Sequence, residues 1–193
     1  MQILKEEVKN NITYGAKKLF SEYGFEKTSM NMIAKEANVS KSNVYNYFAT
    51  KEEIFYYITD AMANDLINMT EFFVNHKFYE KFGSNEFIEM MVQKLFKISS
   101  EHREELLLIM DCSKGTKYED IKSKIINMLE RHFAEGFSEN IAKECFIAHV
   151  IAFNLIEGIL EILRNKKDNR EIYDNFNKLI KYHIKGSEML INK

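Results

Sequence analysis

Side chains that could recognise a nucleic acid are concentrated in the segment SMNMIAKEANVSKSNVYN, residues 29–46. A short helix that starts at Ser40 and buries Val44 would leave its remaining side chains largely facing outward. These side chains offer hydrogen-bond donors and acceptors, a positive charge and an aromatic ring, and they are Lys41, Ser42, Asn43, Tyr45 and Asn46. Such a helix fits the major groove of double-stranded DNA, with side chains near its start reaching base edges. The pattern favours DNA reading, with an ordinary polar helix on a helical bundle as the alternative.

Two short helices joined by a tight turn would hold this face in place. The first, residues 29–36, is amphipathic, and its small Ala34 allows a close approach to a neighbouring helix. The second covers residues 40–46, and Asn38 between them tolerates the left-handed backbone that a tight turn needs. The apolar side chains available to fill the space beneath the turn are Val39, Val44 and Phe48. This arrangement is typical of a helix-turn-helix.

The run NVSKSNVYNYFATKEEIF resembles the signature of the TetR family of bacterial transcriptional regulators. The resemblance continues upstream through AKKLFSEYGFEKTSMNMIAKEANVS and covers roughly residues 8–56, a quarter of the chain. It implies an all-α protein in which an N-terminal three-helix DNA-binding head precedes a larger helical domain for ligand binding and dimerisation. Asn38 replaces a glycine common in the turn, and Asn46 stands where the family often has tyrosine or another large residue. No particular operator sequence therefore carries over from the family.

The resemblance also implies which side chains contact DNA. Lys41, Ser42 and Tyr45 match the positions that usually meet bases. The positions that usually meet the phosphate backbone are Thr28, Asn43, Tyr47 and Lys51. A tyrosine hydroxyl supplies a directed hydrogen bond to a phosphate, and a lysine supplies a mobile positive charge. For Tyr47 we weigh this contact equally with packing of its ring against the first helix.

Apolar residues recur at helical spacing along nearly the whole chain, and no alternating strand pattern competes with them. The chain has no proline, so long helices are not interrupted. Gly24 follows the first apolar run and predicts the end of the first helix near Tyr23. About nine helices are predicted, at residues 3–23, 29–36, 40–46, 51–75, 86–100, 102–112, 117–135, 139–165 and 169–190.

Capping residues mark several of the expected helix starts. In a capping box, a small polar side chain and a carboxylate three residues later satisfy backbone amides that have no partner within the helix. This pattern occurs at Thr50 with Glu53, at Thr116 with Glu119 and at Asp168 with Glu171. Ser138 offers a cap without the carboxylate, and Thr28 or Ser29 can cap the second helix.

By function, the chain divides into a helix-turn-helix DNA-binding domain, residues 1–50, and a helical ligand-binding and dimerisation domain, residues 51–193. Residues 1–51 contain eight lysines and five glutamates, a balance of +3, and the remainder carries −5, which together give the net charge of −2. A modestly basic head on an acidic body fits DNA binding by the head, although the imbalance adds little by itself.

A homodimer is expected, because one head contacts only a few base pairs and two reading helices must lie one DNA turn apart. The last two long helices carry more apolar residues than one buried face needs. Two such helices from each of two subunits can form a four-helix interface, which the resemblance also implies. The expected interface residues are Ile151, Leu155, Ile159, Phe176 and Ile180.

A pocket for a small, mostly apolar effector among the middle helices is implied by the same resemblance. Methionine suits such a pocket because it repacks around different ligands. Candidate lining residues are Met62, Leu66, Met69, Met90, Met91, Met110 and Phe153, together with Phe87, Phe96 and Phe133. Methionine and phenylalanine at helical spacing are also typical of an ordinary core, which is the alternative for each of them.

Metal, thiol and catalytic chemistry have little support in the sequence. Cys145 and His149 are one helical turn apart, as are His76 and Glu80, but two ligands do not make a metal site. The two cysteines, at positions 112 and 145, imply no disulfide framework. We therefore expect no metal, no cofactor and no enzymatic activity.

The expected function is repression of transcription, with release from double-stranded operator DNA when the effector binds. The alternatives are a DNA-binding regulator without a small-molecule effector and, from another class, a helical enzyme or carrier. The sequence shows no uninterrupted apolar run of membrane-spanning length and no export signal. A cytoplasmic protein without a membrane partner is expected.

Overall fold

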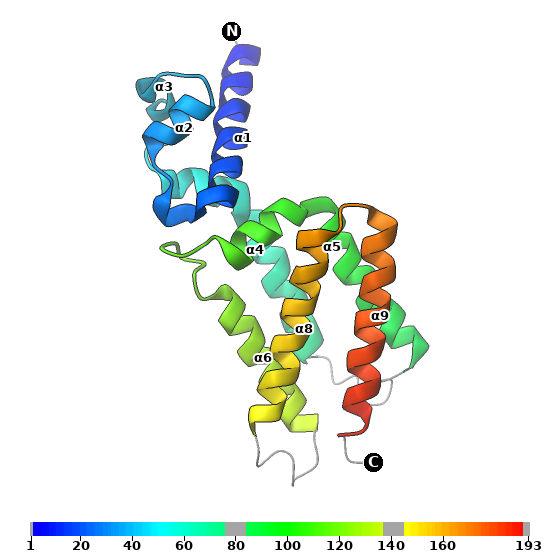
Figure 1. Ribbon diagram of the computed structural model, residues 1–193. Helices are drawn as coiled ribbons and strands as arrows, with labels where there is room; N and C mark the ends of the chain where they lie inside the picture. The colour runs from blue at the N-terminus through cyan, green and yellow to red at the C-terminus, as the bar shows by residue number, and fades with distance from the viewer. Residues whose placement is uncertain (1, 76–83, 137–144, 191–193) are drawn as a thin grey trace. The chain divides into compact units, whose positions relative to one another are not determined.

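The computed structural model describes residues 2–75, 84–136 and 145–190, which form helices and connecting turns and no strands (Figure 1). The helices are α1 (Gln2–Lys27), α2 (Met30–Glu36), α3 (Lys41–Tyr45), α4 (Lys51–Asn75), α5 (Asn85–Asp111), α6 (Ile121–Gly136), α8 (Cys145–Asn165) and α9 (Asn169–Glu188). The predicted all-α fold is confirmed.

Two predicted helix boundaries correspond to breaks inside longer helices. Gly24 interrupts α1 with φ 77° and ψ 164°, after which helical turns resume as far as Lys27. His102 interrupts α5 with φ −137° and ψ 36°, between the helices predicted at 86–100 and 102–112. The Ser138 cap and the first residues of the helix predicted at 139–165 lie outside the described residues.

Most of the predicted caps are present. Ser29 caps α2, because its Oγ accepts a hydrogen bond from Met32 N at 3.3 Å. Asp168 caps α9 and accepts hydrogen bonds from two backbone amides, each at 3.0 Å. Glu53 N donates to Thr50 Oγ1 at 3.2 Å, and the Glu53 carboxylate accepts from the amide of Ala49, one residue before the position expected for a capping box.

The prediction that Thr116 caps a helix starting at residue 117 is wrong, because Thr116 stabilises a turn. Its hydroxyl donates to Ser113 O at 2.7 Å and accepts from Tyr118 N at 3.0 Å. The Glu119 carboxylate accepts from Gly115 N at 3.0 Å. Because these bonds satisfy the turn itself, the helix starts later, at Ile121.

Packing divides the chain into two compact units, which are described separately. Unit 1 contains Met1–Asn64 and Glu104–Ile121, and unit 2 contains Asp65–Arg103 and Lys122–Lys193. Unit 1 extends beyond residue 50 because the start of α4 and the end of α5 share its core. The cluster of buried residues in unit 1 includes Leu108 of α5 as well as residues from α1 to α4.

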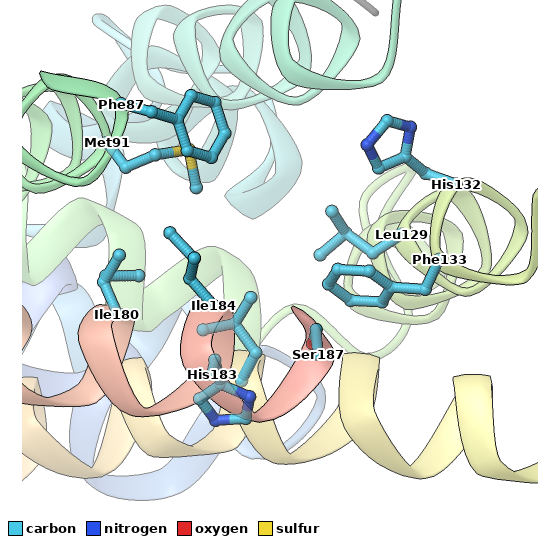
Figure 2. Close-up of a pocket in the computed structure, with 10 residues that line it drawn as sticks. Phe87, Met91, Leu129, His132, Phe133, Ile180, His183, Ile184 and Ser187 are labelled. Carbon is cyan, nitrogen blue, oxygen red and sulfur yellow. The ribbon is translucent and has the colours of Figure 1, made fainter. Parts of the chain in front are cut away.

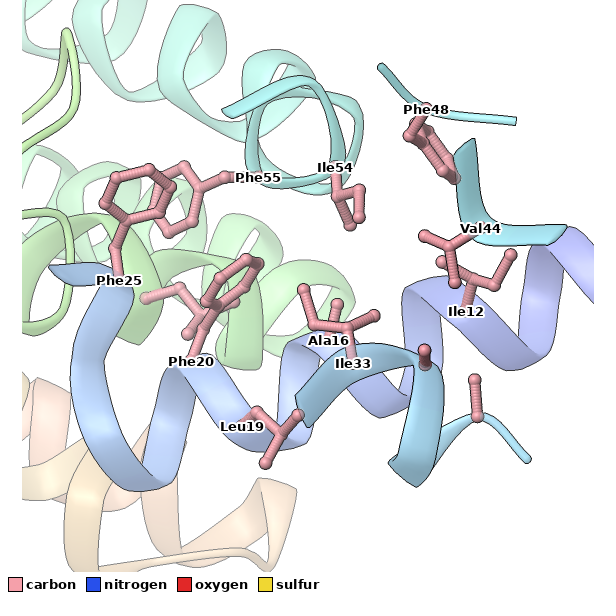
Figure 3. Close-up of a cluster of buried hydrophobic side chains, with 13 residues drawn as sticks. Ile12, Ala16, Leu19, Phe20, Phe25, Ile33, Val44, Phe48, Ile54 and Phe55 are labelled. Carbon is pink, nitrogen blue, oxygen red and sulfur yellow. The ribbon is translucent and has the colours of Figure 1, made fainter. Parts of the chain in front are cut away.

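Three phenylalanines, two from α1 and one from α4, form the centre of the unit 1 core (Figure 3). The ring of Phe55 packs edge-on against Phe20 at 5.2 Å and against Phe25 at 5.3 Å between centroids. Such aromatic pairs add to the free energy gained from burial alone. This cluster fixes α4 against the end of α1.

The end of α5 and the turn that follows are attached to the helices of unit 1. Lys17 of α1 pairs with Glu105 at 2.6 Å and with Glu104 at 3.1 Å. Phe25 N donates to Cys112 O at 3.0 Å. These contacts explain why residues 104–121 belong to unit 1.

Unit 2 is built around the packing of α8 on α9. Gly158 permits a close approach, because an added Cβ would lie 3.1 Å from two methyl carbons of Leu179. The Arg103 guanidinium donates to Leu163 O and so satisfies a carbonyl near the end of α8.

Helix α8 is the one described helix that is long and apolar enough to cross a membrane by length and composition, from Phe146 to Asn165. Its residues Ala152, Leu160 and Leu163 are buried, with at most 1% of each exposed. A core helix of a helical protein meets the same criterion, and 39% of this apolar segment is buried.

Candidate functional site

The turn between α2 and α3 has the geometry expected of a helix-turn-helix. Asn38 has a φ of 55°, which is the left-handed conformation predicted for this position. Val39 N donates to Ala34 O at 3.0 Å and closes the turn. Ser40 caps α3, because its Oγ accepts a hydrogen bond from Asn43 N at 3.1 Å.

One side of α3 is buried and the opposite side is exposed. Val44 is fully buried in the unit 1 core, and Phe48 just after the helix is 5% exposed. Tyr45 is 47% exposed despite its large ring. The Lys41 ammonium lies 5.9 Å from the centroid of the Tyr45 ring. The three residues predicted to meet bases, Lys41, Ser42 and Tyr45, are therefore all exposed on one short helix.

The predicted phosphate-contacting residues are placed less uniformly. Asn43 and Tyr47 are half-buried, and Tyr47 packs against the unit 1 core. Thr28 is only 2% exposed, and its hydroxyl lies 2.8 Å from Gly24 O and 3.2 Å from Leu19 O. Its hydroxyl therefore has partners inside the protein, and phosphate contact by Thr28 stays a prediction.

Lys51 has a structural role that the sequence did not indicate. Its ammonium donates to Phe25 O at 2.8 Å, to Thr28 O at 3.0 Å and to Glu26 O at 3.2 Å. An ammonium has three donors, so these carbonyls use all of them. It also lies 4.2 Å from the centroid of the Phe25 ring. Lys51 thus ties the start of α4 to the end of α1, and a phosphate contact would have to replace one of these bonds.

Gly15 is a further residue that sequence reasoning missed. A Cβ at this position would lie 3.3 Å from Ala37 N and 3.2 Å from Glu36 Cγ. The glycine lets α1 approach the end of α2 closely, beside an ion pair of 2.6 Å between Lys18 and Glu36. A glycine within an otherwise helical pattern was the available signal, because it often marks a close approach.

A small cavity lies within unit 2 among α5, α6, α8 and α9. Its volume is about 50 Å³. It is lined by Phe87, Met91, Leu129, His132, Phe133, Leu155, Ile180, His183, Ile184 and Ser187. Figure 2 shows Phe87 and Met91 facing Ile184, with Leu129 at a third side. The lining is mostly apolar, with polar groups from two histidines and one serine.

The two histidines of the cavity are held towards their neutral forms. Burial lowers the pKa of His132, with a smaller opposing influence from the carboxylate of Glu135. Burial also lowers the pKa of His183. Neutral imidazoles can donate and accept hydrogen bonds in an apolar cavity.

The predicted pocket residues coincide with this cavity only in part. Met91, Phe87 and Phe133 line it. Buried or half-buried residues outside its lining are Met62, Leu66, Met69, Met90, Met110 and Phe96. Phe153 is 45% exposed on α8. Ligand contact by these residues stays a prediction.

The residues predicted for a dimer interface contribute to the interior of unit 2 in the single chain. Phe176 is fully buried, and Leu155 and Ile180 line the cavity. Ile159 is 7% exposed, and Ile151 is half-buried. The apolar residues exposed on α8, on α9 and at the C-cap of α9 are instead Phe146, Ile147, Phe153, Tyr182 and Met189. Contact with a second copy through the predicted residues stays a prediction.

Among the described residues, no three His, Cys, Asp or Glu side chains are grouped so that they could hold a metal ion. His149 Nδ1 lies 2.8 Å from Glu130 Oε2, which links α8 to α6. The pair of His76 and Glu80 lies outside the described residues, as does the side chain of Cys145.

The N-terminal segment matches a known family. Residues 12–58 match the family described as bacterial regulatory proteins, tetR family. The chain is 36% identical over 58 residues to YhgD of Bacillus subtilis (strain 168), an uncharacterized HTH-type transcriptional regulator, covering 30% of each chain. It is 30% identical over 101 residues to the HTH-type transcriptional regulator SAR2658 of Staphylococcus aureus (strain MRSA252), covering 51% of each. The matched segments thus span 30% and 51% of these relatives.

The fold is similar to that of solved structures over most of the chain. A member of the TetR transcriptional regulator family from Streptomyces coelicolor A3 superimposes with a TM-score of 0.60 and 18% identity, covering 88% of each chain. At this identity the similarity concerns the fold. Over residues 12–58 the chain therefore resembles the tetR family of bacterial regulatory proteins, and its helical fold is similar to that of a solved TetR-family regulator.

Proposed function

We propose that the protein is a cytoplasmic transcriptional repressor that binds operator DNA as a homodimer and leaves it when a small, mostly apolar ligand binds in unit 2. The observation that carries DNA binding is the orientation of α3. Its Val44 is buried, which leaves Lys41, Ser42 and Tyr45 exposed together, as a helix in the major groove requires.

Selection of binding sites from a pool of randomised duplexes tests this function. The protein should enrich a sequence with two related halves about one helical turn apart, because a symmetric dimer reads a symmetric site. Replacement of Tyr45 by Ala should lower affinity for the selected site by about 1–3 kcal/mol and leave the helical circular dichroism unchanged. Unchanged affinity would exclude α3 as the reading helix.

Ligand binding is supported by the cavity in unit 2, but the cavity must widen. Its volume is about 50 Å³, whereas pockets for drug-sized ligands are about 300–1,000 Å³. A ligand that enters would have to separate the side chains of Met91, Leu129 and Ile184. The ligand-bound state would therefore differ from the structure described here, which is the requirement for a switch.

The irregular backbone inside α5 is where ligand binding in unit 2 could affect unit 1. Arg103 donates to a backbone carbonyl within unit 2, whereas Glu104 and Glu105 pair with Lys17 within unit 1. The irregular residue His102 immediately precedes these anchors. Displacement of α5 by a ligand would therefore act on residues attached to the DNA-reading unit.

Reciprocal linkage tests the proposed switch. A ligand that favours the released state must weaken DNA binding by the same factor by which DNA weakens ligand binding. DNA affinity should be measured with and without each compound that raises the melting temperature of the protein. A compound that binds tightly without altering DNA affinity would overturn the switch and leave DNA binding intact. The small cavity also favours a second candidate, a regulator without an effector.

A further inference from the structure

A polar groove in unit 1 lies beside α3, and apart from Tyr47 its residues are not among the DNA contacts that the family resemblance implies. It has a volume of about 220 Å³ and is lined by Lys5, Glu6, Lys9, Asn10, Tyr47 and Tyr57. Four of these residues belong to α1 before residue 12, where the match to the family begins. Tyr47 lies two residues after the end of α3, so the groove borders the proposed DNA-binding face.

Lys9 is held in this groove by aromatic rings. Its Nζ lies 3.8 Å from the centroid of the Tyr57 ring and 5.6 Å from that of Phe48. These two rings pack against each other at 5.5 Å. An ammonium above an aromatic face is attracted to it but keeps its hydrogen-bond donors. The rings therefore fix the position of the charge without neutralising it.

The surroundings of Lys9 suit an oxygen-rich anion. Tyr57 is 57% exposed although its ring is large. Together with Tyr47 it places two phenol groups in the groove. Lys5 adds a second positive charge and Glu6 one negative charge, which leaves the lining with a small positive balance. Ammonium and phenol donors on one surface match the non-bridging oxygens of a phosphodiester.

The position of the groove fits the geometry of a helix in the major groove. When a reading helix enters this groove of DNA, the elements at its flanks meet the two phosphate backbones. Figure 1 shows the N-terminal half of α1 beside α2 and α3 at one end of unit 1. A duplex that contacts the exposed side of α3 would bring a backbone towards Tyr47 and α1.

We propose that Lys9, positioned by Tyr57, binds a phosphate of the DNA backbone and extends the DNA-binding surface onto the N-terminal half of α1. This inference rests on the proposed DNA-binding function. It assigns contact residues that are not part of the helix-turn-helix. A phosphate contact carries no sequence preference, so it should strengthen binding to any duplex.

The salt dependence of DNA binding tests this proposal without knowledge of the operator. The probe is a mixed-sequence 40-base-pair duplex, titrated by fluorescence anisotropy at several potassium chloride concentrations. The replacement Lys9→Gln should weaken binding and reduce the slope of log K against log salt by about 0.9, because one fewer counterion is released. Lys9→Arg should keep the slope, because the charge and its attraction to the ring remain.

Two further variants sharpen the test. Glu6→Gln should strengthen binding, because it removes the negative charge of the groove. Lys114→Gln is the matched control. Lys114 is an exposed lysine of the same unit, it does not line the groove, and its Nζ lies 3.2 Å from Glu26 Oε2. It should leave the slope unchanged. Thermal unfolding of each variant shows that the fold is retained.

The outcomes separate this inference from the proposed function. Wild-type binding with an unchanged slope for Lys9→Gln would overturn the groove contact and leave DNA binding by α3 in place. An equal loss of slope for Lys9→Gln and Lys114→Gln would also overturn it, because the effect would be that of total charge. Absence of any salt-dependent DNA binding by the wild-type protein would overturn both.

Discussion

Helix α3 and the unit 2 cavity differ in how their residues are brought together. The exposed side chains of α3 lie within the five residues Lys41–Tyr45, and one capped turn of helix orients all of them. The cavity takes its lining from α5, α6, α8 and α9, over a sequence range from Phe87 to Ser187. A site made by one helix can be predicted from local spacing, whereas a site made between helices depends on how those helices pack.

The largest expected effect is a loss of stability in unit 1 that leaves unit 2 folded. Phe55→Ala removes a fully buried ring that contacts Phe20 and Phe25, and such truncations cost about 3–5 kcal/mol. Amide hydrogen exchange should show unit 1 opening more often while α9 stays protected. DNA binding should be lost with it. Equal loss of protection in both units would mean that they unfold as one.

A smaller effect is expected at the attachment between α4 and α1. Lys51→Met keeps an unbranched side chain but removes the ammonium, which donates to three backbone carbonyls and lies 4.2 Å from the centroid of the Phe25 ring. We expect a loss of about 1–3 kcal/mol in the free energy of unfolding, measured with urea. If Lys51 instead serves DNA alone, stability will be unchanged and only the salt slope will fall.

The cavity should make the stability of unit 2 depend on pH. Burial lowers the pKa of His132 and His183 in the folded state, so below the ordinary histidine pKa of about 6.5 the unfolded chain binds more protons. The contribution of these neutral histidines to the free energy of unfolding should therefore be fully present above this pH. It should be lost as pH falls towards their lowered folded-state pKa. Urea unfolding at several pH values, followed by spectroscopic probes placed on α8 and α9, measures the free energy of unfolding of unit 2. The wild-type protein is compared with His183→Phe. A pH response that the variant leaves fully intact would contradict the role of His183.

The smallest expected effect concerns the surface of unit 1. The ion pair between Lys18 and Glu36 is exposed, and the carboxylate raises the pKa of Lys18 through their hydrogen bond. Solvent and salt screen an exposed ion pair, so Lys18→Ala should hardly change the melting temperature. A loss of stability as large as that of Lys51→Met would instead show that this ion pair is needed for the close packing of α1, at Gly15, against the end of α2.

Predictions from spacing succeeded where one short segment decides the outcome. The left-handed Asn38, the Ser40 cap and the burial of Val44 were all expected, and each depends on residues at most a few positions away. The same local pattern gave a wrong prediction for Thr116, because its hydroxyl oxygen accepts from the nearer amide of Tyr118, within a turn. Sequence spacing cannot rank two local partners that compete for one side chain.

The sequence alone determined that this protein is all-α, where most of its helices begin, and which face of α3 is exposed. These properties follow from hydrophobic periodicity, helix capping and backbone preference, which act over a few residues. Only the tertiary structure decided that Lys51 binds the end of α1, that Lys9 lies on Tyr57, and which residues line the cavity. Each of these depends on contacts between segments far apart in the chain, and no local pattern specifies which distant partner a side chain meets.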